Sequence, residues 1–274
     1  MKKNNILLLT SVLMTLSFSS CTQKTIKTEE KDFIKKFYLS EDTAKGALSV
    51  DLEIELPVSF QNKAVLDSIR STIIAHLFGK EFINHQNDSI LIHFASELSQ
   101  EYIDNNAPLL NHLDSGSVYS FNNEHSVEGF ALLTDENIFT YGIDRNVYMG
   151  GAHNLETRNY YNFDLKTGKV ISESDIFKSN VMAELTKIIK LRIVEESDDI
   201  ESLEELNESV FWTDSIKPNG NFYITDESIN YVFNPYEIAP YAYGDTEVSL
   251  PFSYIKKLLK PNSVIDYLVN KQVK

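Results

Sequence analysis

His153 has the most site-like surroundings of any residue in this sequence, because Gly150 and Gly151 lie just before it. Glycines adopt positive φ angles at little cost, so the loop can turn sharply and bring His153 close to neighbouring backbone. A histidine that acts as a general base needs a nucleophilic side chain and an orienting carboxylate. The chain has no Gly-x-Ser-x-Gly elbow. We interpret the segment as a structural or site-like loop, in which His153 is structural, a partner contact or a catalytic base.

Carboxylates near this loop, at Asp144, Glu156 and Asp164, allow a glycosidase-like pair by residue type, but their spacing does not indicate one. The histidines near the predicted helices form no pair at i, i+4 and have no carboxylate at zinc-site spacing: His76, His85, His93 and His112. We therefore expect no catalytic residue, no metal site and no cofactor.

The segment from Asn234 to Gly244 is better suited to binding than to catalysis. It contains two Pro-Tyr pairs, and its candidate partner-binding residues are Pro235, Tyr236, Pro240, Tyr241 and Tyr243. Tyrosine offers a large contact area with two side-chain torsions to order, and proline reduces the entropy lost on binding. The alternative is a loop that folds back and closes the end of a sheet.

Strands are expected on both sides of these loops. Apolar residues alternate with polar ones from Leu48 to Leu56, the period of a strand with one buried face and one acidic face. The same alternation, at Tyr161, Phe163 and Leu165, follows the His153 loop, and Lys166–Lys169 then predicts a turn into a strand at Val170. Further strands are expected at 118–121, 126–134, 137–143, 221–225, 229–233 and 246–250.

Helices are expected between these strands. Asn62 is a typical N-cap for an apolar-faced helix that ends near Leu77, before Gly79. Others are expected from residue 88 or 89 to about 102, from about 180 to 193, from 253 to 259 and from 264 to 269, and the acidic run at 195–208 favours an amphipathic helix. The fold class is therefore α+β, with antiparallel sheets, helices packed on one face and two related α/β pieces.

The N-terminus indicates where the protein acts. Lys2 and Lys3 precede an apolar segment from Ile6 to Phe18, and small residues lead to Cys21, the single cysteine. This pattern is typical of a bacterial lipoprotein signal, so we expect residues 1–20 to be removed and Cys21 to carry the lipid. The protein is then held at the bacterial envelope, extracytoplasmic and periplasmic or surface-exposed, and no disulfide is expected. The alternative is an ordinary signal peptide with an incidental cysteine.

The charge of the chain excludes one class of partner. The formal net charge is −15, and removal of Lys2 and Lys3 with the signal peptide makes it −17, with 23 basic and 40 acidic residues. Such a surface repels nucleic acid and favours cationic partners, although acidity also serves solubility.

Two stretches resemble a known family. GGAHNLETRNYYNFDLKTGKVISESDIF, from Gly150, and FYITDESINYVFNPYEIAPYAYG, from Phe222, are similar to the extracytoplasmic region of the RsiV family of lysozyme-sensing anti-sigma factors. They also resemble the non-catalytic N-terminal region of PdaC-type peptidoglycan deacetylases. The similarity covers roughly residues 48–259. It implies an α+β fold of two related pieces that binds lysozyme, a basic enzyme, through loops similar to 235–241. We expect neither the sigma-binding segment nor the deacetylase domain of these families in this protein.

These observations together predict an organisation and a function. The expected segments are a signal peptide at 1–20, a tether at 21–47, an N-terminal portion at 48–144, a C-terminal portion at 145–260 and a tail or short helix at 261–274. We expect a non-catalytic, membrane-anchored binding module for a lysozyme-like protein, acting as a sensor or inhibitor. The alternatives are a peptidoglycan- or glycan-binding module and, less favoured, a hydrolase centred on His153.

Overall fold

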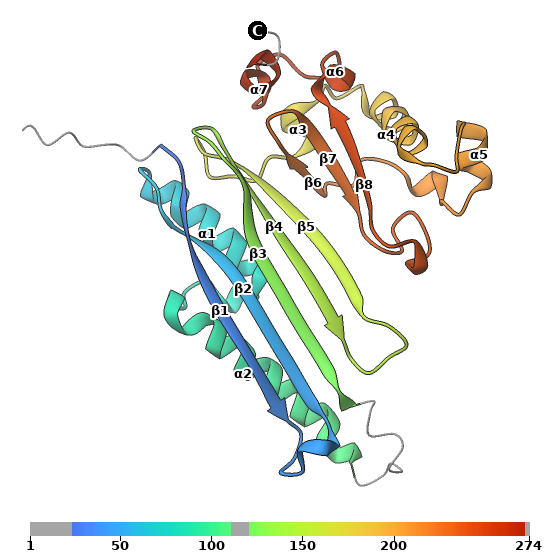
Figure 1. The fold of residues 1–274 in the computed structure, drawn as a ribbon. Coiled ribbons are helices and arrows are strands. Elements are labelled where there is room, and N and C mark those ends of the chain that lie inside the picture. Colours follow the sequence, from blue (N-terminus) through green and yellow to red (C-terminus); the bar gives the residue numbers. More distant parts are fainter. Residues whose placement is uncertain (1–23, 111–120, 272–274) are drawn as a thin grey trace, which may run out of the picture.

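The fold combines a long five-stranded sheet with a smaller three-stranded sheet and helices, as predicted for an α+β protein (Figure 1). The computed structural model describes residues 24–110 and 121–271. Cys21 and most of the strand expected at 118–121 lie outside these residues. The large sheet has the order β1-β2-β3-β4-β5, with strands at Lys27–Tyr38, Ala47–Ser59, Asn123–Thr134, Ile138–Tyr148 and Leu155–Asp164.

Strand β2 follows its sequence pattern closely. The apolar positions predicted from Leu48 to Leu56 are all buried, while the polar positions between them lie on the opposite face. One expectation is wrong, because β2 and β3 pair in parallel and the sheet is therefore mixed. The reason is the connection. Helices α1 (Lys63–Leu77) and α2 (Asn87–Asn106) return the chain to the end of the sheet at which β2 begins, and parallel strands need such a crossover.

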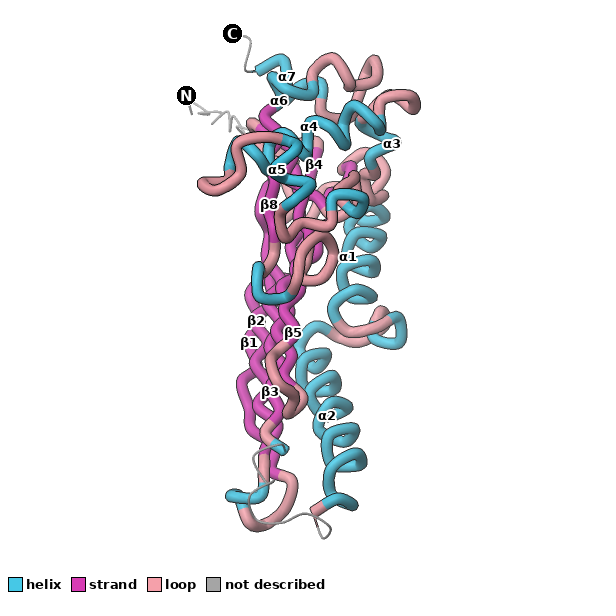
Figure 2. The backbone as a smooth tube through the Cα atoms, turned by 90° about the vertical axis from the view of Figure 1, so that its right-hand side faces the viewer, coloured by secondary structure: helices cyan, strands magenta, loops and turns pink. Residues whose placement is uncertain are grey.

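Helices α1 (Lys63–Leu77) and α2 (Asn87–Asn106) cover one face of the large sheet and leave the other face free of helices (Figure 2). As predicted, Asn62 caps α1, its side chain accepting hydrogen bonds from the backbone nitrogens of Ala64 and Val65 at 3.1 and 3.3 Å. The apolar sides of both helices pack on β2, β3 and β4, which forms the first hydrophobic core.

The predicted tether is wrong from Lys27 onward, because β1 occupies Lys27–Tyr38 and pairs with the whole of β2. Phe33 lies opposite Leu52, and it packs with Phe37 against the first core. The charged composition of this stretch resembles that of a linker. It is also what an edge strand needs, since one side of β1 is half-buried and the other is exposed.

The C-terminal unit builds a second core around strands β6 (Phe222–Ile224), β7 (Ser228–Phe233) and β8 (Thr246–Pro251). Its helices are α3 (Glu173–Ile176), α4 (Met182–Glu196), α5 (Leu203–Glu208), α6 (Phe252–Ile255) and α7 (Asp266–Lys271). Part of the acidic run is therefore helical, as expected, with Leu206 buried. The strand expected at Val170 is reduced to one bridge, between Phe163 and Val170.

The predicted boundary at Asp144 falls inside β4, in the middle of the first sheet. Strands β4 and β5 pair along ten positions, and Phe163 and Leu165 still belong to the first core. The buried residues of the second core come from Ile171 onward, with one addition, Ile138 at the start of β4. The two units therefore meet after Leu165 rather than at residue 144.

Asparagine side chains join the two sheets at the outer edge of β5. Asn221 accepts from the Tyr160 nitrogen at 3.0 Å and donates to the Arg158 carbonyl at 2.8 Å. Asn234 accepts from the Arg158 nitrogen at 2.7 Å. In the opposite direction, buried Asn162 donates to the Phe222 carbonyl at 2.7 Å and accepts from the Ile224 nitrogen at 2.9 Å. Side-chain amides thus make hydrogen bonds with β5 that a further strand of the sheet would otherwise make.

Candidate functional site

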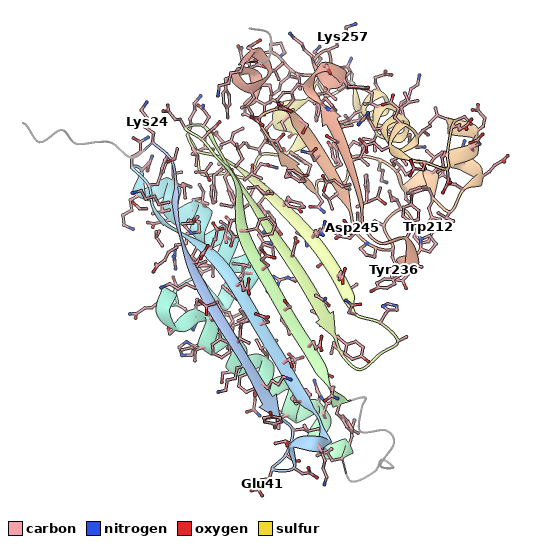
Figure 3. The ribbon with its side chains drawn as sticks, in the orientation of Figure 1. Lys24, Glu41, Trp212, Tyr236, Asp245 and Lys257 are labelled. Carbon is pink, nitrogen blue, oxygen red and sulfur yellow. The ribbon has the colours of Figure 1, made fainter. Side chains whose placement is uncertain are left out.

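The structure brings together the two loops that the sequence singled out. The rings of His153 and Tyr241 stack with centroids 3.8 Å apart and an interplanar angle of 19°. Tyr236 lies over the same pair, with its ring centroid 6.4 Å from His153 and 5.6 Å from Tyr241. Figure 3 shows Tyr236 at the tip of the C-terminal unit that faces the β4–β5 loop.

The β4–β5 loop is held by its own hydrogen bonds. The Tyr148 hydroxyl donates to the Gly151 carbonyl at 3.0 Å, and Gly150 has a φ of 80°, which favours glycine. The Asn154 carbonyl lies 2.7 Å from His153 Nδ1, so that nitrogen must carry the proton. In the neutral ring Nε2 is then an acceptor, 3.5 Å from the Tyr236 hydroxyl. These contacts fit a ring that organises two loops and are not those of a base beside a nucleophile.

Tyr241 is fixed from both sides. Its hydroxyl donates to Asn154 Oδ1 at 2.9 Å, and Asn154 Nδ2 in turn donates to Asn146 Oδ1 at 2.9 Å and Glu156 Oε1 at 2.8 Å. Asn146 and Glu156 lie opposite each other on β4 and β5. The network therefore connects the loop cluster to the face of the large sheet.

The Pro-Tyr loop divides into buried and exposed parts. Ile238 and Ala239 lie in the second core, so the loop does close the end of the small sheet. Tyr236, with a φ of 71°, and Tyr243 are 52% and 48% exposed, whereas Tyr241 is half-buried. Pro235 fixes the backbone before Tyr236, and exposed Pro240 precedes a 3-10 turn at Tyr241–Tyr243. The loop therefore closes the end of the small sheet with its buried residues and exposes its tyrosines to solvent.

Trp212 was missed by the sequence analysis and belongs to the same surface. Its backbone nitrogen donates to the Ile238 carbonyl at 2.7 Å, and its side chain is 43% exposed (Figure 3). Its neighbour Phe211 packs edge-on against Tyr243, with ring centroids 4.7 Å apart. We call Tyr236, Tyr243 and Trp212 the aromatic surface. A single tryptophan in a polar stretch after the acidic run was the signal available in the sequence.

Carboxylates cross the open face of the large sheet in one line. The strand register places four carboxylates side by side on neighbouring strands, namely Asp32, Glu53, Glu128 and Asp144. The next residue in this line is Arg158 on β5. The carboxylates lie on the face opposite α1 and α2, because the alternate residues of β2 point into the first core. We call these four residues the carboxylate row. Like charges directly opposite each other destabilise a sheet, so the row has an energetic cost.

Asp144 occupies the most constrained position of the row. Burial, followed by the carboxylates of Glu128 and Asp245, raises its pKa, although Arg158 opposes the effect. The Arg158 guanidinium lies 3.6 Å from Asp144 and 3.2 Å from Asp245, which precedes β8. Asp144 Oδ1 is buried and has no hydrogen-bond partner. One guanidinium therefore compensates only part of the negative charge at this end of the row.

A hollow of about 200 Å³ lies between the row and the loop cluster, and it is lined by Ser126, Glu128, Asp144, Arg145, Asn146, Glu156, Thr157 and Arg158. Among the residues that the structure describes, no group of three or more potential metal ligands is found. The acceptor-rich hollow and the exposed rings are instead suited to a partner that presents cationic and apolar side chains.

Residues 174–253 match a family described as "Protein of unknown function (DUF3298)". The match runs from α3 to α6 and includes the Pro-Tyr loop and Trp212, while His153 lies outside it. It is consistent with the resemblance to the RsiV and PdaC ectodomains and does not by itself extend to them. No curated protein matches the sequence.

Two crystal structures of DUF3298 proteins show the same fold. A Bacteroides fragilis member is 23% identical with a TM-score of 0.81, covering 89% of this chain and 97% of its own. A Pseudomonas aeruginosa member is 15% identical with a TM-score of 0.56, covering 86% and 95%. At these identities the likeness establishes the α+β architecture.

Proposed function

We propose that this chain is a non-catalytic binding module, held at the extracytoplasmic face of the bacterial envelope by a lipidated Cys21. The lipoprotein-like pattern before Cys21 supports the anchor. In the described part of the chain, no helix is long and apolar enough to cross a membrane. The contacts of His153 with two tyrosine rings support a role in holding loops rather than in catalysis.

The partner that we propose is a small basic protein of the lysozyme type. The observation that carries this proposal is the carboxylate row. It ends at Arg158, which pairs with Asp245, two residues after Tyr243 of the aromatic surface. A cationic partner would offset the repulsion within the row, while exposed tyrosine and tryptophan rings supply the apolar contact that binding also requires.

Titration of residues 22–274 with lysozyme, at low and high salt, tests this function. We expect the affinity to fall as the salt concentration rises. It should fall roughly three-fold or more in Glu53→Gln/Glu128→Gln, and binding should be lost in Tyr236→Ala. Glu204→Gln/Glu205→Gln on α5 is the matched control, because it removes two charges away from the row, and it should bind like the parent. Equal losses in both double variants would indicate a response to net charge alone.

A glycan is the second candidate, favoured by the same exposed rings, which can stack on sugar faces. Sedimentation with purified peptidoglycan distinguishes it, because stacking on a neutral sugar changes little with salt. Retention on peptidoglycan without lysozyme binding would replace the first proposal. Loss of a hydrolytic activity in His153→Ala would revive the third, catalytic interpretation.

A further inference from the structure

Lys24, the first described residue, fixes the end of the molecule at which an anchor attaches. Its Nζ lies 3.0 Å from Glu136, in the turn between β3 and β4 (Figure 3). Cys21 is three residues earlier, and an extended chain reaches at most about 3.6 Å per residue. A lipid on Cys21 would therefore leave this end of the module within about 11 Å of its attachment point.

The candidate site lies at the other end of the same strands. Strand β4 runs from Ile138, beside that turn, to Tyr148, where the loop of His153 begins. Eleven strand residues span roughly 35 Å at about 3.3 Å per residue. Figures 1 and 2 agree that the turn between β3 and β4 lies with α6 and α7 at one end, while the loop after β4 lies far from it.

The end near Lys24 carries several lysines in an otherwise acidic protein; most are exposed, whereas Lys260 is half-buried and donates to the Ser174 carbonyl at 3.0 Å. Residues 252–271 contain four lysines and one carboxylate, Asp266. The Lys178 Nζ donates to the Lys257 carbonyl at 2.7 Å, which adds a fifth lysine to the group. We call this group the lysine end: Lys178, Lys256, Lys257, Lys260 and Lys271. The Tyr267 hydroxyl donates to Asp135, so α7 is tied to the β3–β4 turn and the lysines lie on the same end as Lys24.

Carboxylates at this end are mostly engaged in internal hydrogen bonds. Asp175 accepts from the Ser172 nitrogen at 2.9 Å, and Glu173 accepts from the Gly220 nitrogen at 2.8 Å. Asp226 and Glu227, in the turn between β6 and β7, are exposed and flank the lysines. An anionic plane therefore repels the lysine end less than it repels the carboxylate row.

We propose that the lysine end docks on anionic lipid headgroups, so that the candidate site is held roughly 35 Å farther from the bilayer than the β3–β4 turn. The docking rests on the lipid anchor of the proposed function. Each lysine near an anionic surface adds to the attraction, which falls off within a Debye length of about 8 Å. The distant acidic face is thus screened from the membrane, and the module stands upright rather than lying on its sheet.

Energy transfer from single labels measures this orientation in the full-length, lipidated protein. Cys21 is the only native cysteine, so Ser253→Cys on α6 and Glu41→Cys at the far end of the sheet each give one thiol to label once the anchor is acylated. The protein is reconstituted in vesicles of phosphatidylcholine with roughly 30% phosphatidylglycerol, carrying a headgroup acceptor. We expect transfer at residue 253 to exceed transfer at residue 41 several-fold, because the two positions lie at opposite ends of the sheet.

Neutralised lysines separate docking from anchoring. Lys256→Gln/Lys257→Gln/Lys260→Gln should reduce the difference between the two labels at least about two-fold, because the orienting charge is removed. Lys35→Gln/Lys36→Gln/Lys45→Gln, at the far end, should leave the difference unchanged. Equal transfer at both positions in vesicle-bound protein would overturn the docking and leave the anchor standing. Protein recovered free of vesicles would overturn the anchor and the docking together.

Discussion

His125 shows how one residue sets a pH limit for this fold. Its ring faces the helices from β3 and packs edge-on against Phe94, with centroids 5.8 Å apart. Burial, and then the charge of Arg145, lowers the pKa of His125 to about 4, and its Nε2 is buried without a partner. The unfolded chain has an ordinary histidine pKa near 6.5, so it binds a proton more readily than the folded state does between these values.

Stability should therefore fall as the pH drops from 6.5 towards 4. Between pH 7 and pH 4.5 the loss attributable to His125 is about 2 kcal/mol in the free energy of unfolding. In His125→Phe, which keeps the ring packing and cannot be protonated, this part of the loss should be absent. Urea unfolding at the two pH values measures it, with His93→Phe as a control. Parallel pH profiles for the parent and His125→Phe would contradict the assignment.

At the residue scale the sequence singled out individual side chains but did not indicate how they contact one another. His153, Tyr236 and Tyr241 were singled out separately, and the structure brings their rings into one cluster. Their contact depends on the position of the second unit against β5, which local spacing does not encode. The carboxylate row was hidden for a similar reason: each member belongs to a different strand, and only strand register aligns them.

At the element scale, Gly168 joins the turn after β5 to helix α1. Its φ is 72°, and a Cβ there would lie 3.1 Å from the Val65 carbonyl oxygen and 3.1 Å from Ser68 Cβ. The Ser68 hydroxyl also donates to the Gly168 carbonyl at 3.0 Å. This single close approach fixes the end of the large sheet against the start of the helix layer.

Gly168→Ala should lower the free energy of unfolding by about 2–4 kcal/mol, since it adds backbone strain and a steric clash. Gly220→Ala is the matched control, because Gly220 also has a positive φ, 78°, but open space around it. It should cost only about 1–2 kcal/mol, the strain alone. Chemical denaturation of both variants gives the comparison, and equal losses would show that the clash is relieved by movement of the turn.

Most helices and strands were predictable because their apolar periodicity is strong. Asn62 and α1 are examples in which local signals and tertiary structure agree. Strand β1 was missed because its charged residues match those of a linker, and its assignment depends on pairing with β2. The parallel pairing of β2 and β3 was missed because residues 62–110 between them determine it, rather than any residue within either strand.

At the scale of the whole molecule, Asn162 connects the two sheets, and we expect it to couple the two cores. It is 2% exposed, and its amide nitrogen donates to the Phe222 carbonyl. Its amide oxygen accepts from the Ile224 nitrogen and the Thr140 hydroxyl. These groups belong to both sheets. Loss of the amide would leave two buried backbone groups of β6 without partners, and each such group costs about 1–3 kcal/mol.

Asn162→Ala should therefore lower stability by about 2–5 kcal/mol and separate unfolding into two transitions, with the C-terminal core melting first. The parent should unfold in one transition. Calorimetry with fluorescence of Trp212, which lies in the C-terminal unit, distinguishes the two cases. Asn219→Ala, which removes amide bonds within the C-terminal unit only, is the control. A single transition in Asn162→Ala would show that packing alone couples the cores.

The amide side chains along β5 also determine how copies of this protein behave beside one another. An unprotected sheet edge is a template for polymerisation, because a second chain can add its own strand. Here Asn221 and Asn234 already occupy the Arg158 and Tyr160 backbone groups, and the opposite edge, β1, carries four lysines. Neither edge of the large sheet is therefore favourable for pairing with a strand from another molecule. Molecules concentrated in the plane of a membrane would thus resist growth into fibres while their loops stay accessible.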